Sequence, residues 1–138
     1  MKRSATAIWN GSIKEGAGKI TTQSTTLNNT QYSFKSRFEE GVGTNPEELI
    51  AAAHAGCFAM ALSLILGEAG FIPKSLEANA TITMDTEKLQ LTSSHIVLKA
   101  NIPGISQEKF EECTKNAKAG CPISKVLNLD ISLDASLI

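Results

Sequence analysis

Residues 45–60, NPEELIAAAHAGCFAM, decide the fold of this chain, because they join a helix start to a nearly unbroken apolar run. An asparagine cap, a proline in the first turn and a glutamate three residues past the cap are all helix-start signals. We expect the helix to run to about Glu68, roughly 30 Å at 1.5 Å per residue, and to stop at Gly70. A helix that is apolar on all sides belongs at the centre of a globular core.

The segments before this helix predict three short strands in an antiparallel meander. They cover residues 5–9, 19–27 and 32–38, with glycines and a pair of asparagines between them. In the third segment aromatic residues alternate with polar ones, so we expect Arg37 to point away from the aromatic face.

The segments after the helix return to strand periodicity and then to helix. We predict strands at 76–84 and 94–102 around a turn at 85–89, a helix from a Ser106 cap to about residue 119, a short helix capped by Cys121, and a last strand at 130–137. The order of strands, long helix, strands, helices and strand predicts an α+β fold with mostly antiparallel sheet. We interpret residues 1–138 as a single domain.

Composition excludes several kinds of partner. At 138 residues and 42% hydrophobic content, the chain can bury a core without a disulfide or a metal ion. A net charge of −1 with mixed signs gives no electrostatic footprint for nucleic acid or an anionic membrane.

An odd number of cysteines and no signal-peptide pattern favour the cytoplasm. Residues 49–66 have the length of a membrane span, but alanines and polar residues dilute their apolarity, so we interpret them as core.

Two of the three cysteines suggest redox chemistry. Cys57 lies in the middle of the long helix, and Cys121 lies at a backbone break between a glycine and a proline. Two thiols in such positions suit a disulfide that is made and unmade in a chemical cycle, although an incidental buried thiol is the alternative for each. At a helix N-terminus the pKa of Cys121 should fall below the free value of about 8.5. The residues alone neither bring the two thiols together nor say which one attacks first.

Other candidate residues have simpler interpretations. Cys113 lies on the apolar stripe of the predicted 106–119 helix and about 12 Å along the axis from Cys121, beyond the bridging limit of about 7 Å, so we place it in the core. His54, one turn before Cys57, could act as a base, but a core or interface histidine is favoured. His95 is interpreted as structural. No close cysteine pairs indicate zinc, and we expect no metal or cofactor.

Two charged residues near the helix start are also candidates. Glu48 should complete the capping box, which leaves Glu47 as a spare carboxylate. On pattern alone Arg37 is an ordinary solvated strand residue.

Four stretches of the chain resemble one known family. The sequences YSFKSRF (32–38), GTNPEELI (43–50), AAHAGCFAMAL (52–62) and KAGCPIS (118–124) are similar to the osmotically inducible protein C (OsmC) family of thiol peroxidases. The similarity extends over nearly the whole chain. It is closer to the OsmC branch than to the organic hydroperoxide resistance proteins, because the matching arginine is Arg37, beside the glycine turn.

The resemblance implies a fold and an activity. It implies an intertwined homodimer with a long buried central helix and two active sites at the subunit interface. It also implies that Cys57 is the peroxidatic thiol, Cys121 the resolving thiol, and Arg37 with Glu47 the activating pair. The expected reaction reduces organic hydroperoxides, and hydrogen peroxide less efficiently, to alcohols at the expense of a dithiol or lipoyl-type donor. The alternative is a non-catalytic redox sensor or binding protein that uses the same cysteine pair.

Overall fold

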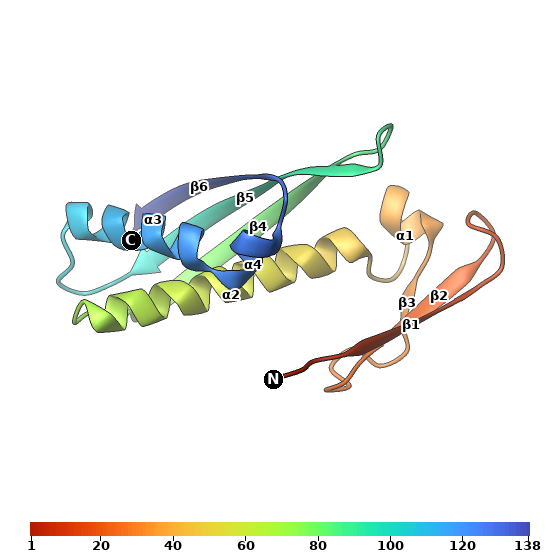
Figure 1. Cartoon of the computed structure of the whole chain (residues 1–138), viewed down its shortest axis with the longest axis horizontal. Helices are drawn as coiled ribbons and strands as arrows, with labels where there is room; N and C mark the ends of the chain where they lie inside the picture. The colour runs from red at the N-terminus through yellow and green to blue at the C-terminus, as the bar shows by residue number, and fades with distance from the viewer. The chain divides into compact units, whose positions relative to one another are not determined.

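The computed structural model describes residues 1–138 as six strands and four helices, so the α+β prediction is confirmed (Figure 1). The elements fall into two compact units, Met1–Leu49 and Ile50–Ile138. In chain order they are β1 (Ala5–Asn10), β2 (Ala17–Thr22), β3 (Thr30–Tyr32), α1 (Phe34–Phe38), α2 (Pro46–Glu68), β4 (Ser75–Asp85), β5 (Gln90–Asn101), α3 (Gln107–Gly120), α4 (Pro122–Val126) and β6 (Asp130–Leu137).

The first unit is built on a three-stranded meander in the order β1-β2-β3. Both strand pairs are antiparallel, as predicted. The second strand ends at Thr22 rather than at residue 27, because the chain turns there and the Thr22 side chain bonds the Leu27 amide at 3.1 Å. The Trp9 and Tyr32 rings lie 5.5 Å apart and pack the sheet on one face.

The predicted third strand over 32–38 is wrong beyond its first residue. The strand ends at Tyr32, and the helix α1 begins after Ser33, whose side chain and that of Ser36 form a reciprocal capping box. Phe34 and Phe38 are four residues apart, which places their rings on one helical face with centroids 4.9 Å apart. Arg37 does not point away from the aromatic residues, since its guanidinium lies 5.2 Å from the centre of the Phe38 ring.

The start of α2 was predicted correctly except for one contact. The Asn45 side chain accepts a hydrogen bond from the Glu48 amide at 2.8 Å, as an N-cap does. The Glu48 carboxylate does not close a capping box with Asn45 but accepts the Thr44 hydroxyl at 2.7 Å. Gly43 leads into this cap with a φ of +115°, and a side chain there would collide with the Gln31 carbonyl.

The second unit holds the core of the molecule. Its sheet has the order β4-β5-β6, with β4 antiparallel and β6 parallel to β5. The helices α2 and α3 pack against one face of this sheet (Figure 1). The fully buried residues of this core are Phe58, Leu62 and Leu66 of α2, Ile96, Leu98 and Ala100 of β5, and Phe110 and Ala117 of α3.

Two short-range predictions in this unit are confirmed. Ser106 caps α3 by accepting the Lys109 amide at 3.1 Å. The helix α4 begins after Cys121 with Pro122 in its first turn. The sequence thus places a helix N-terminus directly beside the Cys121 sulfur.

The helix α2 buries only one side within the chain. His54, Phe58, Leu62 and Leu66 recur every four residues and are buried, whereas Met60 and Leu64 are 77% and 65% exposed. By length and composition alone this helix could cross a membrane, with a mean hydropathy of 2.1 over its most apolar window, but core helices of globular proteins pass the same test.

Candidate functional site

The two cysteines singled out from the sequence lie together in the structure. The sulfur atoms of Cys57 on α2 and Cys121 at the start of α4 are 2.7 Å apart, and both residues are free thiols. A disulfide has a bond length of about 2.05 Å, so only a small movement is needed to form one. Sixty-four residues of sequence separate the pair, and the packing of α2 with α3 and α4 brings them into contact.

The Cys121 sulfur lies at the start of α4, where polar groups of the helix influence its ionisation. Burial opposes its ionisation, but hydrogen bonds from Cys57, from the amide and hydroxyl of Ser124 and from the amide of Ile123 outweigh burial and hold the pKa of Cys121 below its ordinary value. Unpaired amides at the start of α4 therefore stabilise a thiolate, as the sequence predicted for a cysteine at a helix N-terminus.

Cys57 is in the opposite situation. Burial and its hydrogen bond to Cys121 raise the pKa of Cys57, and the Ile123 amide only partly offsets them. Within the chain, Cys121 is thus the more acidic thiol of the pair. A peroxidatic Cys57 consequently needs a positive charge that the residues around it in the second unit do not supply.

An open apolar groove of about 930 Å³ adjoins the thiol pair. Cys57 reaches its wall, together with Met60, Ala61, Leu64 and Ile65 of α2 and with Gly120, Pro122 and Ile123 at the junction of α3 and α4. Cys57 is partly exposed there, whereas Cys121 is fully buried behind it. An apolar ligand in this groove would therefore meet Cys57 first.

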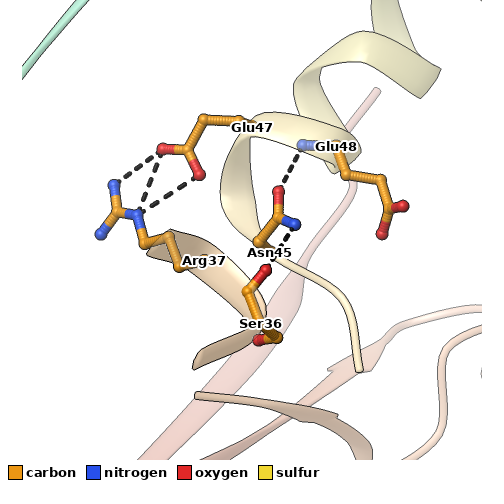
Figure 2. A network of polar contacts seen from close by, with 5 residues as sticks. All are labelled: Ser36, Arg37, Asn45, Glu47 and Glu48. Atoms are coloured by element: carbon orange, nitrogen blue, oxygen red, sulfur yellow. Dashed lines mark hydrogen bonds and ion pairs between the residues drawn. The ribbon is translucent and has the colours of Figure 1, made fainter. Parts of the chain in front are cut away.

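Arg37 and Glu47 form an ion pair in the first unit. Figure 2 shows the guanidinium facing the carboxylate, with Nη2 donating to Oε1 at 2.8 Å and Nε donating to both oxygens at 3.2 and 3.3 Å. The Nη1 atom of Arg37 bonds no other group of the chain, so one edge of the guanidinium is free to donate. Glu47 takes no part in the cap of α2, as expected, and is thus engaged with Arg37.

A polar network fixes the position of this ion pair. Asn45 donates from its side-chain amide to the Ser36 carbonyl at 2.9 Å while it caps α2 (Figure 2). Ser36 donates its hydroxyl to the Thr44 carbonyl at 2.8 Å. Because Ser36 precedes Arg37 and Asn45 lies two residues before Glu47, the network holds α1 against the first turn of α2.

His54 makes no hydrogen bond to Cys57. Each of its two ring nitrogens instead bonds the hydroxyl of a serine. Its imidazole is fully buried, with Nδ1 2.7 Å from the Ser94 hydroxyl on β5 and Nε2 2.8 Å from the Ser124 hydroxyl on α4. Burial lowers the pKa of His54, so the ring is neutral at physiological pH. The favoured interpretation of a core histidine agrees with this geometry.

The remaining cysteine and histidine lie elsewhere. Cys113 is 1% exposed within the core beside Phe110 and Ala117, and burial raises its pKa, as expected of a structural thiol. His95 lies half-exposed on β5, with Nδ1 2.6 Å from the Ser132 hydroxyl and Nε2 3.2 Å from the Asp134 carboxylate.

Sequence reasoning missed the two serines around His54. Ser124 is three residues past Cys121 in the first turn of α4, so the helix N-terminus was a signal that its side chain lies near the sulfur. Ser94 carries no comparable signal, because only the packing of α2 on the sheet brings it to a residue 40 positions away.

The fold and the adjacent thiols define a protein of the dithiol redox class. A family model described as OsmC-like protein matches residues 39–136, and the chain belongs to this family. The chain is 49% identical over 133 residues to peroxiredoxin OsmC of Escherichia coli strain K12, a match that covers 95% of this chain and 93% of that protein. It is 33% identical over 96 residues to the organic hydroperoxide resistance protein OhrA of Bacillus subtilis, covering 67% of each.

Solved structures share the fold. The crystal structure of the organic hydroperoxide resistance protein OhrB of Bacillus subtilis matches with a TM-score of 0.66 and 25% identity, over 96% of this chain and 98% of that one. An OsmC-like protein of Vibrio cholerae matches with a TM-score of 0.75 and 15% identity over 99% of each chain. The predicted OsmC-like fold is confirmed.

Proposed function

We propose that this chain reduces organic hydroperoxides to alcohols through a disulfide cycle between Cys57 and Cys121. The chain is a thiol-dependent peroxidase, as its similarity to peroxiredoxin OsmC and to organic hydroperoxide resistance proteins indicates. The observation that carries the cycle is the pair of free sulfurs 2.7 Å apart, one of which reaches an apolar groove.

The cycle has three steps. The Cys57 thiolate attacks the outer peroxide oxygen, the O–O bond breaks, and the leaving alkoxide takes a proton to become the alcohol. Cys57 is left as a sulfenic acid, which Cys121 converts to a disulfide with loss of water. A dithiol or lipoyl-type donor then reduces the disulfide by exchange. A nearby resolving thiol protects Cys57 from further oxidation.

Arg37 and Glu47 are proposed as the activating pair. The pKa of Cys57 is raised in its own surroundings, so its thiolate needs a cation close by. The unbonded Nη1 edge of Arg37 can donate both to the thiolate and to the negative charge that develops on the leaving oxygen. Glu47 holds two other donors of the guanidinium and so would orient that free edge.

The groove supports a preference for organic hydroperoxides over hydrogen peroxide. Its lining is almost wholly aliphatic around Cys57, with Met60 and Leu64 exposed to it. Apolar contact of this kind binds an alkyl chain and gives nothing to hydrogen peroxide.

The remaining proposals concern the oligomeric state, the cellular location and the domain organisation. The exposed apolar side of α2 supports a homodimer with the active site at the subunit interface, because a second copy that closes over the groove would remove much of Met60 and Leu64 from water and still leave a pocket beside Cys57 for the substrate. A cytoplasmic location and a single OsmC-like domain over residues 1–138 complete the proposal.

Single-turnover kinetics test the roles of the two thiols. Cys57→Ser should abolish peroxide consumption, because no other thiol reaches the groove. Cys121→Ser should consume one equivalent of organic hydroperoxide per subunit and stop at a sulfenic acid, seen by trapping with a 1,3-dione and mass spectrometry. Cys113→Ser is the matched control and should react as the wild type does. Equal inactivity of the Cys57 and Cys121 variants would refute the assignment.

Steady-state turnover separates the enzyme from the alternative of a redox sensor. With excess dithiol, repeated consumption of peroxide supports the cycle. Consumption of one equivalent per subunit and then none would favour the sensor.

A further inference from the structure

A chain of hydrogen bonds runs through the core to the first turn of α4, beside the sulfur of Cys121. It begins at the Ser94 hydroxyl on β5, passes through both ring nitrogens of His54 on α2, and reaches the Ser124 hydroxyl, which lies three residues past Cys121 and helps to lower the pKa of that thiol. The contacts at the imidazole are 2.7 and 2.8 Å, and the ring is fully buried. The chain ends beside the thiol that the proposed cycle uses second.

The direction of this chain follows from hydrogen-bond counting. A neutral imidazole donates at one nitrogen and accepts at the other, and each serine hydroxyl has one hydrogen to donate. If Nε2 carries the hydrogen, His54 donates to the Ser124 oxygen, and the Ser124 hydrogen is left to point at the Cys121 sulfur. Ser94 then donates its own hydrogen to Nδ1. With the other tautomer, Ser124 would donate to His54 and could offer Cys121 no hydrogen.

We propose that His54 is a positioning residue that, through the Ser124 hydroxyl, holds Cys121 as a thiolate ready to attack the oxidised Cys57. This inference rests on the proposed function, because it takes Cys121 to be the resolving thiol. Neutral groups are suited to the task, since they stabilise the thiolate without placing a compensating charge in the core.

The step that His54 would assist is the closing of the disulfide. The Cys121 thiolate attacks the sulfur of the Cys57 sulfenic acid, and a sulfur–sulfur bond forms as the sulfur–oxygen bond breaks. The bonding pair leaves with the oxygen as hydroxide, which takes a proton from solvent to become water. The Cys121 sulfur is oxidised, and the Cys57 sulfur is reduced from sulfenic acid to disulfide.

No charged side chain competes with this effect. The groups that set the ionisation of Cys121 are Cys57 of α2 and the Ile123 and Ser124 groups of α4. Around His54 only burial shifts the pKa, and its polar neighbours are Ser94 on β5 and Ser124 on α4. Loss of the Ser124 hydrogen bond should therefore appear directly in the ionisation of Cys121.

Two substitutions of His54 distinguish an effect of the hydrogen-bond chain from an effect of altered packing. The amide nitrogen of glutamine falls near the position of Nε2, so His54→Gln keeps a donor to Ser124 and leaves Ser94 unpaired. The shorter asparagine reaches the position of Nδ1, so His54→Asn keeps the partner of Ser94 and leaves the Ser124 oxygen without a donor. Both variants are neutral and each removes the His54 partner of one buried serine, which makes them matched controls.

The first measurement is the pKa of Cys121, independent of peroxide chemistry. Thiolate absorbance is titrated in a Cys57→Ser background, and the curve of the Cys57→Ser, Cys121→Ser double variant is subtracted to isolate Cys121. We expect His54→Asn to raise the pKa of Cys121 by up to about one unit, because Ser124 keeps its own hydrogen but loses the donor that orients and polarises the hydroxyl, and His54→Gln to leave it nearly unchanged. Equal shifts in the two variants, or none in His54→Asn, would overturn the proposal.

The second measurement is the rate of disulfide closure with Cys57 present. After one equivalent of cumene hydroperoxide, His54→Asn should consume peroxide at the wild-type rate but close the disulfide about two- to threefold more slowly at neutral pH. The deficit is modest because a thiolate of higher pKa is also more nucleophilic, and it should disappear at pH values above the raised pKa. A deficit that is the same at every pH would show damage to packing and would contradict the inference.

The outcomes distinguish this inference from the proposed function. If the wild type forms no sulfenic acid or disulfide, the proposed function fails, whereas the Cys121 titration still tests the hydrogen-bond chain. If His54→Asn does not fold, Ser124→Ala takes its place, because it removes the hydroxyl itself and replaces a small buried side chain by one of similar size. Ser124→Ala should raise the pKa of Cys121 by about one to two units, the effect of losing one hydrogen bond to a charged group, and an unchanged pKa would overturn the proposal.

Discussion

Arg37 is the residue on which activation of Cys57 is expected to depend. Its Nε and Nη2 atoms are held by Glu47, its plane lies over the Phe38 ring, and its Nη1 atom is free. Arg37→Met keeps much of the aliphatic contact but removes the charge. Since one preorganised donor to a developing oxyanion contributes about a hundredfold in rate, we expect the peroxide step to slow by about that factor. Stopped-flow measurement with an organic hydroperoxide at one equivalent checks this.

The control for this prediction lies on the same helix. Lys35 is exposed on α1, and Lys35→Met removes a similar charge without touching Glu47. It should leave the peroxide step unchanged. Wild-type kinetics in Arg37→Met, or equal slowing in both variants, would remove Arg37 from the activating role.

The residues also show the limit of sequence reasoning about the site. Cys121 was predicted beside a helix N-terminus, and Glu47 was predicted as the carboxylate not needed by the cap, because both inferences depend on neighbours within a few positions. The contact of Cys57 with Cys121 and that of His54 with Ser94 span 64 and 40 residues. No local pattern encodes such contacts, since they arise when a helix and a sheet pack together. For the thiol pair, only the family resemblance supplied the expectation.

At the scale of elements, the junction of α1 and α2 positions the proposed activating pair. Asn45 both caps α2 and donates to the Ser36 carbonyl, so Asn45→Ala should lose about 1 kcal/mol of stability from the cap and also loosen Arg37 from Glu47. Asn45→Asp keeps the cap acceptor and loses only the donor to Ser36. Urea unfolding should rank the wild type, Asn45→Asp and Asn45→Ala in decreasing order of stability. Equal stability of Asn45→Ala and the wild type would contradict this account of the junction.

The same junction explains the one element that was predicted wrongly. Alternating aromatic residues over 32–38 fit a strand, but Phe34 and Phe38 are also four residues apart, and Ser33 and Ser36 form a capping box. Over so short a segment the sequence fits both the two-residue period of a strand and the four-residue spacing of a helix. The capping box of Ser33 and Ser36 favours the helix. The longer helices were predicted closely, because α2 is a long apolar run between an asparagine cap and a glycine stop, and α3 repeats an apolar stripe over several turns after the Ser106 cap.

At the scale of the whole molecule, the proposed dimer rests on apolar surface that the chain leaves uncovered. Met60 and Leu64 lie on the outer side of α2, 77% and 65% exposed, opposite the side that packs in the core. Apolar side chains grouped on one helix face are typical of a protein interface, and a charge buried there without a partner opposes association. We therefore expect the wild type to sediment as a dimer and Leu64→Lys to sediment as a monomer at the same concentration.

Leu89→Lys is the matched control for Leu64→Lys. Leu89 is 70% exposed at the turn between β4 and β5, away from α2, so the same change there should leave the dimer intact. Circular dichroism should show both variants folded, because neither side chain belongs to the core. Sedimentation velocity over a range of concentrations makes the comparison quantitative, since a weakened dimer dissociates at higher concentration than the wild type does. If Leu64→Lys remains as dimeric as Leu89→Lys, the subunits do not associate through this face of α2, and another surface must form the homodimer.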